Sequence, residues 1–137
     1  MSATSLVVAM GLPVFGCTLA DHARYEERLS PDAFELIRAP GLFIDLREAS
    51  ERRQQGSPRG SISIPYGFPD SFVARVEAAA GHDRAAAIVL ICRAGTNSRM
   101  AADLLASRGF TNVTSVSDGF GGSSHGPGWK AWGLPVE

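Results

Sequence analysis

The stretch of sequence that most restricts the fold is an apolar run, Ala87 to Ile91, followed by Cys92, a turn of small and polar residues and a helical pattern. A short apolar run bounded by turn signals is typical of a strand buried on both faces of a parallel sheet. Cys92 then lies at the carboxyl end of this strand and faces the amino terminus of the next helix, where N–H groups and the helix dipole favour an anion. Because the thiolate is the reactive form of cysteine, we predict that Cys92 is a nucleophile or the carrier of a transferable atom.

Further short apolar runs alternate with segments of helical pattern along the rest of the chain. The first helix is expected to have Ser30 as its N-cap and Pro31 at its first helical position. This alternation predicts an α/β fold in which a central, mostly parallel sheet has helices on both faces. Sites in such sheets lie at the carboxyl ends of the strands, where Asp45 and Cys92 both fall. We expect strands at 42–46, 61–64, 87–91 and 113–116 and helical segments at 30–37, 47–53, 72–80 and 98–107.

Composition narrows the class of protein. The 137 residues are 45% hydrophobic and 20% charged, which is typical of one globular domain with its own core. A formal net charge of −1 argues against a general nucleic-acid binder. Two cysteines, Cys17 and Cys92, do not make a disulfide framework, so a reducing environment is expected. The histidines occur singly, without zinc-ligand spacing, and we expect neither a metal nor a cofactor.

The amino terminus has a separate character. Residues 6–16 are mostly apolar, and residues 18–20 could form a cleavage site for a signal peptidase. No Lys or Arg precedes Arg24, so the positive region of a signal peptide is missing, and the run is too short to span a membrane. We therefore divide the chain into an unassigned apolar segment, 1–20, and one domain, 21–137. A cytoplasmic location is expected, with export as the alternative if residues 1–20 act as a signal peptide.

Four segments carry recognisable motifs. Residues 43–48 read Phe-Ile-Asp-Leu-Arg-Glu, and residues 56–65 read Gly-Ser-Pro-Arg-Gly-Ser-Ile-Ser-Ile-Pro. Residues 92–98 read Cys-Arg-Ala-Gly-Thr-Asn-Ser, and the chain closes with Asp-Gly-Phe at 118–120 and Trp-Lys-Ala-Trp-Gly-Leu-Pro-Val at 129–136. In this order they resemble the motifs of the rhodanese (sulfurtransferase) family, with Ser57 where that family usually has histidine. The resemblance runs from about Tyr25 to Glu137.

The resemblance implies a rhodanese-like fold with a five-stranded sheet and assigns roles to individual residues. Cys92 would be the nucleophile that takes sulfur from a donor such as thiosulfate and passes it, through a persulfide, to cyanide or a thiol. A protein could also accept the sulfur. Asp45 would hold the active-site loop by hydrogen bonding, with capping of the charged turn that follows as the less favoured alternative. Arg93 and Arg47 would add positive charge near an anionic donor. The loop that surrounds the sulfur would consist of Arg93, Ala94, Gly95, Thr96, Asn97 and Ser98, with Gly95 allowing a positive φ.

Two other classes of protein remain as alternatives. A related cysteine phosphatase or arsenate reductase would have arginine six residues after the cysteine to clamp a phosphate-like group, whereas this chain has Ser98 there and Arg99 one position later. A noncatalytic or carrier module would deliver persulfide sulfur to a partner protein. Such modules typically lose the cysteine, which is retained here. Residues 119–128 are expected to form a surface loop that could contact a partner or cover the site, and the charged residues 48–53 are expected to be solvated.

Overall fold

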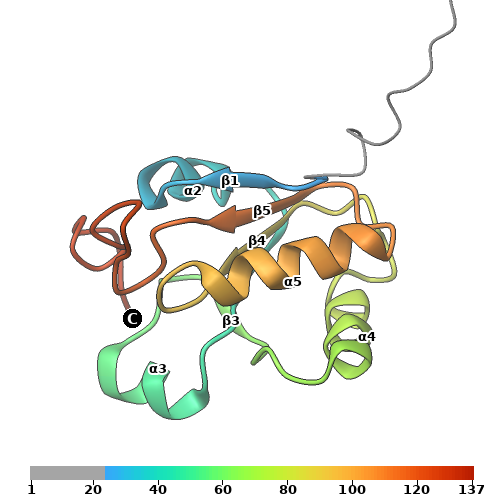
Figure 1. Ribbon diagram of the computed structural model, residues 1–137, viewed down its shortest axis with the longest axis horizontal. Helices are drawn as coiled ribbons and strands as arrows, with labels where there is room; N and C mark the ends of the chain where they lie inside the picture. The colour runs from blue at the N-terminus through green and yellow to red at the C-terminus, as the bar shows by residue number, and fades with distance from the viewer. Residues whose placement is uncertain (1–23) are drawn as a thin grey trace, which may run out of the picture.

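The computed structural model describes residues 24–137, so the expectations for residues 1–20 and for Cys17 lie outside the described residues. Its centre is a five-stranded sheet with the strand order β1-β5-β4-β2-β3, and every neighbouring pair is parallel (Figure 1). The predicted α/β class and five-stranded parallel sheet are confirmed. The strands are β1 (Glu26–Arg28), β2 (Leu42–Asp45), β3 (Ile62–Ser63), β4 (Ile88–Ile91) and β5 (Val113–Val116), and the helices are α2 (Ser30–Leu36), α3 (Ala49–Gln55), α4 (Pro69–Ala79) and α5 (Thr96–Ser107).

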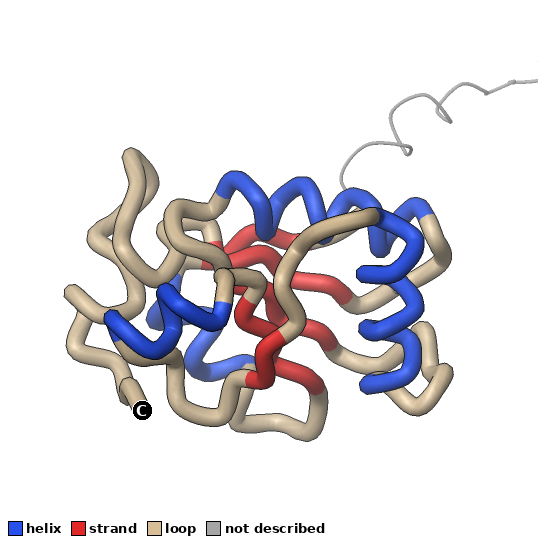
Figure 2. The backbone as a smooth tube through the Cα atoms, turned by 90° about the horizontal axis from the view of Figure 1, so that it is seen from below, coloured by secondary structure: helices blue, strands red, loops and turns tan. Residues whose placement is uncertain are grey.

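The central strands are buried on both faces because successive side chains point to opposite sides of the sheet. Ile88 and Leu90 of β4 belong to a core with α4 and α5, whereas Val89 and Ile91 belong to a second core with α2 and the carboxyl-terminal segment. Figure 2 shows the strands enclosed between helices and loops on both sides. Trp129 fills the second core with no exposed surface and contacts Phe34 and Phe43. The uninterrupted apolar pattern of β4 follows from this double burial.

Several details differ from the sequence-based expectations, among them the bounds of α3, which covers Ala49–Gln55 instead of 47–53. Strand β1 was not predicted, because its three residues are charged and exposed and it lies at the edge of the sheet. Helix α5 begins at Thr96 rather than at residue 98, and α4 begins at Pro69 rather than at residue 72. The N-cap assignment of Ser30 is wrong: Leu29 has that position and Ser30 is the first helical residue. The buried Ser30 instead donates its backbone N–H and its hydroxyl to Asp118 Oδ1.

Within residues 24–137, no helix combines the length and the apolar character needed to cross a lipid bilayer.

Candidate active site

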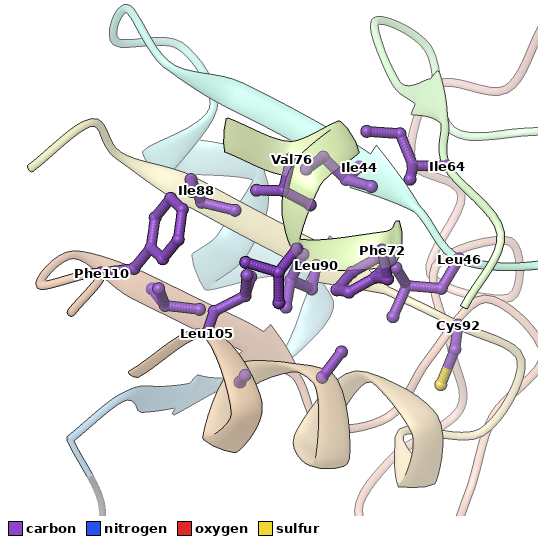
Figure 3. Close-up of a cluster of buried hydrophobic side chains, with 14 residues drawn as sticks. Ile44, Leu46, Ile64, Phe72, Val76, Ile88, Leu90, Cys92, Leu105 and Phe110 are labelled. Carbon is purple, nitrogen blue, oxygen red and sulfur yellow. The ribbon is translucent and has the colours of Figure 1, made fainter. Parts of the chain in front are cut away.

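The Cys92 sulfur lies where β4 ends and faces the first turn of α5. Figure 3 shows Cys92 at the edge of the core cluster, with its sulfur directed to this helix. The backbone N–H groups of Gly95 and Ser98 donate to Cys92 Sγ over 3.1 and 3.3 Å. These donors and the positive end of the helix dipole stabilise a thiolate more than a neutral thiol. The residue is only 4% exposed, so reagents reach its sulfur through the cavity above it.

Gly95 makes the sharp turn into α5. It has φ of 93°, in the left-handed region that L-residues rarely adopt, and it is the N-cap of the helix. A Cβ at this position would overlap the carbonyl oxygen of Ser117, so the loop is closely packed against the end of β5. Gly95 is therefore needed both for the turn and for the N–H that it directs at the sulfur.

Two buried hydroxyl groups lie below the sulfur. Ser98 Oγ is 3.5 Å from Cys92 Sγ and donates to the carbonyl oxygen of Gly95 over 3.1 Å. Ser115, on β5, donates to Ser98 Oγ over 2.8 Å. Neither serine has exposed surface. The Gly95 carbonyl also accepts the backbone N–H of Arg99, so the Ser98 hydroxyl can turn to a thiolate without leaving that carbonyl unpartnered.

A cavity of about 340 Å³ opens above Cys92. The predicted residues Arg47, Arg93, Ala94, Thr96 and Asn97 line it, whereas Gly95 and Ser98 contact the sulfur from the helix side. Four residues of its lining were not predicted to belong to the site. They come from the loop after β2, from α3 and from the segment before α4, and they are Leu46, Glu48, Glu51 and Tyr66.

Arg93, in the lining of this cavity, is held by a carboxylate of α3. Its Nε and Nη2 each lie 2.9 Å from an oxygen of Glu51, which makes a two-point ion pair. The hydrogen bond from Arg93 lowers the pKa of Glu51, and partial burial opposes this. The same hydrogen bond raises the pKa of Arg93, with smaller contributions from the charges of Glu51 and of the Cys92 sulfur. The expectation that residues 48–53 form only a solvated surface is therefore wrong for Glu51, and also for Arg52, whose guanidinium pairs with the buried Asp45.

Asp45 is bound to arginines rather than to the loop. Its carboxylate accepts the backbone N–H of Arg47 over 3.0 Å, and both its oxygens contact the Arg47 guanidinium. Arg52 Nη1 lies 3.2 Å from the same carboxylate. Among the side-chain contacts that the structure gives Asp45, none reaches residues 92–98. This arrangement corresponds to the alternative in which Asp45 organises the charged turn that follows β2.

Arg47 is buried and largely occupied by structural contacts. Only 3% of the residue is exposed, Nη2 also donates to the Gly56 carbonyl over 2.8 Å, and the guanidinium stacks 3.9 Å from the centre of the Phe120 ring. Its Nη1 has no hydrogen-bond partner in the structure. Arg47 therefore places positive charge in the cavity wall while it holds β2, α3 and the loop after β5 together.

Comparison with known proteins decides the family. The Rhodanese-like domain family matches residues 30–124, well over half of the chain. The chain belongs to the rhodanese-like family. The resemblance inferred from the four motifs is thus confirmed.

Among curated relatives, this rhodanese-like chain is 31% identical over 111 residues to the thiosulfate sulfurtransferase GlpE of Actinobacillus pleuropneumoniae, covering 80% of this chain and 91% of that protein. An uncharacterised protein of Rickettsia prowazekii is 31% identical over 103 residues, covering 69% of this chain and 80% of that protein.

Solved structures agree on the fold. A Rhodopseudomonas palustris protein of unknown function, described as a possible tyrosine phosphatase, superposes with a TM-score of 0.69 at 21% identity and covers 93% of this chain and 100% of that one. The Mycobacterium tuberculosis protein Rv0390 superposes with a TM-score of 0.64 at 26% identity, covering 82% and 96%. The similarity to the R. palustris protein establishes the fold alone.

The start of the loop after β5 is hydrogen-bonded to the backbone of the active-site loop, whereas residues 121–127 lie at the surface, as expected. The backbone N–H groups of Phe120 and Gly121 donate to the carbonyls of Cys92 and Arg93 over 2.8 and 2.9 Å. Asp118, fully buried, fixes the base of this loop by accepting hydrogen bonds from Ser30, from Gly128 N–H and from Trp132 Nε1. Residues 24–137 contain no cluster of three or more side chains that could together hold a metal ion.

Proposed function

We propose that this protein is a sulfurtransferase that moves sulfane sulfur from a donor such as thiosulfate to a thiol or cyanide through a persulfide on Cys92. The observation that carries the proposal is the position of Cys92 Sγ. This sulfur accepts hydrogen bonds from two backbone N–H groups, and Cys92 lines a cavity of about 340 Å³. The 31% identity to a thiosulfate sulfurtransferase over most of both chains supports the same reaction class.

In the first half-reaction the Cys92 thiolate attacks the outer sulfur of the donor. A new S–S bond forms on Cys92, the S–S bond of thiosulfate breaks, and sulfite leaves with the electron pair. The N–H groups of Gly95 and Ser98 stabilise the thiolate before attack, and Arg93 in the cavity lining provides positive charge for the sulfonate oxygens.

In the second half-reaction an acceptor thiolate or cyanide attacks the terminal sulfur of the persulfide. The bond to Cys92 breaks, and its electron pair returns to Cys92, which is again a thiolate held by the same N–H groups. The two half-reactions share one covalent intermediate, so ping-pong kinetics are expected. No external oxidant or reductant is consumed.

Intact-mass spectrometry tests the proposal. After treatment with thiosulfate the wild-type protein should gain the mass of one sulfur atom and lose it again on addition of cyanide. Cys92→Ser is the control and should remain unmodified. A wild-type protein that gains no sulfur from thiosulfate or any other sulfane donor would overturn the proposal.

A carrier role is the second candidate, favoured by the ion pair that occupies Arg93 and makes it less available to a small anionic donor. A carrier would form the persulfide in a single turnover but transfer it slowly to small acceptors. Comparing single-turnover persulfide formation with steady-state thiocyanate production separates the two roles.

Phosphatase chemistry has little support in the geometry. The position of the clamping arginine is taken by the buried Ser98, and Arg99 lines a different cavity beside residues 117 and 123–125. Appreciable turnover of an aryl phosphate would overturn this interpretation.

A further inference from the structure

The exposed arginine of the Cys92 cavity, Arg93, already forms an ion pair with a carboxylate of the protein, that of Glu51. Arg47 and Arg93 both line the cavity, and so do Glu48 and Glu51. Arg47 is committed to Asp45 and is almost completely buried. Arg93 is the more exposed arginine, with 67% of its side chain accessible, yet both of its contacting nitrogens are bound to Glu51.

An anionic donor that uses Arg93 must therefore compete with Glu51. The Arg93 side chain is exposed enough to rotate at small cost, since solvent-exposed ion pairs are weak. Glu51 is only 21% exposed, so once Arg93 has left, its carboxylate stays beside the cavity and repels the incoming anion. This repulsion grows with the charge of the donor, and a dianion experiences it about twice as strongly as a monoanion.

We propose that Glu51 is a specificity-determining residue that disfavours doubly charged sulfane donors, so that the preferred donors carry one negative charge or none. This inference rests on the proposed sulfur transfer through Cys92 and names the class of donor for that same site. Helix α3 would thus determine which donor charge the cavity accepts. It does so through Glu51, which binds Arg93 of the loop after β4, 42 positions later in the sequence.

The test compares two sulfane donors, thiosulfate and methanethiosulfonate, that react in the same way but differ in charge. Thiosulfate carries two negative charges. Methanethiosulfonate has a methyl group in place of one charged oxygen and carries one. Both present a terminal sulfur to Cys92 and release a sulfur oxyanion when the S–S bond breaks. The measured quantity is the ratio of kcat/KM for thiosulfate to kcat/KM for methanethiosulfonate, with cyanide as the common acceptor.

Glu51→Gln should raise kcat/KM about tenfold for thiosulfate and about threefold for methanethiosulfonate, so the ratio increases about threefold. The gain should shrink as salt is added, because the charges are close to the surface. In an Arg93→Ala background, Glu51→Gln should raise the ratio at least as much, since the Glu51 carboxylate there repels the donor with no arginine to neutralise it.

Glu48→Gln is the matched control. Glu48 lines the same cavity and carries the same charge, but the structure gives it no contact with Arg93. It should change the ratio less than Glu51→Gln does. The inference is overturned if the ratio is unchanged in Glu51→Gln, or if Glu48→Gln raises it equally. If neither donor adds sulfur to the wild-type protein by mass spectrometry, the proposed function itself fails, which is a different result from persulfide formation with an unchanged ratio.

Discussion

Ser115 donates a hydrogen bond to Ser98 over 2.8 Å, and Ser98 Oγ in turn lies 3.5 Å from the Cys92 sulfur. The Ser115 hydrogen occupies one lone pair of Ser98 Oγ, so the Ser98 hydrogen is left to bind either the Gly95 carbonyl or the sulfur. A hydroxyl held in this way can donate to Cys92 whenever the sulfur carries a negative charge.

Ser98→Ala should therefore lower kcat/KM for thiosulfate about tenfold, because a hydrogen bond to a charged group contributes about 1.5–3 kcal/mol. Ser115→Ala should have a smaller effect in the same direction. In the Ser98→Ala background it should have no further effect on kcat/KM, and an undiminished effect there would show that Ser115 acts on the site by another route.

Gly95→Ala should destabilise the protein by about 3 kcal/mol or more and remove most of the activity, because the new Cβ combines a disfavoured φ with a backbone overlap. Gly60→Ala is the control, since Gly60 has a similar φ of 85° but a Cβ added there would have no other atom within 4 Å. It should cost only about 1–2 kcal/mol and leave sulfur transfer intact. Urea denaturation measures the stability of both variants, and sulfur transfer is assayed under conditions in which both are folded. Equal losses of activity in the two folded variants would contradict the role given to Gly95.

Asp45→Asn should destabilise the fold by about 3–5 kcal/mol, because it leaves the buried Arg47 guanidinium without its counter-charge. Asp70→Asn removes the carboxylate of an exposed ion pair with Arg108 and should cost less than about 1 kcal/mol. Urea denaturation followed by tryptophan fluorescence measures both. A small cost for Asp45→Asn would mean that Arg47 finds other partners when the carboxylate is lost.

The ion pair between Glu51 and Arg93 should make a small contribution to stability that depends on pH. Arg93 lowers the pKa of Glu51 below its ordinary value of 4.5, mainly by its hydrogen bond, and the charge of Arg47 adds to this. A carboxyl whose pKa is lower in the folded state stabilises the fold when it is ionised. The contribution is therefore fully present above pH 4.5 and is lost as the pH falls through the lower, folded-state value.

The measurement is the urea midpoint of the wild type and of Glu51→Gln from about pH 7 to about pH 3. The wild type should have the higher midpoint at neutral pH, and the two midpoints should converge at the acidic end. A difference that persists unchanged at the lowest pH would rule out the ionised carboxylate as its cause.

Local sequence was sufficient for the elements whose patterns are strong. Strands β2 and β4 were predicted in full, each with one extra residue, because double burial leaves a run that is apolar throughout β4 and apolar up to Asp45 in β2. Strand β1 could not be predicted, since its charged residues pair only through backbone hydrogen bonds with β5, which lies far later in the chain. Ser30 was misassigned because a serine before proline has the pattern of an N-cap, whereas its hydroxyl is taken up by Asp118.

By itself, the sequence determined the family, the α/β class and the position of Cys92 between a strand and a helix, because all three depend on short contiguous motifs. Only the tertiary structure decided which groups surround that sulfur. Glu51 reaches Arg93 from α3, and Ser115 reaches Ser98 from β5. Asp45 binds Arg47 and Arg52 rather than the loop. The parallel sheet brings the carboxyl ends of distant strands to one edge, so contacts there depend on the folded backbone and leave no periodic pattern in the sequence.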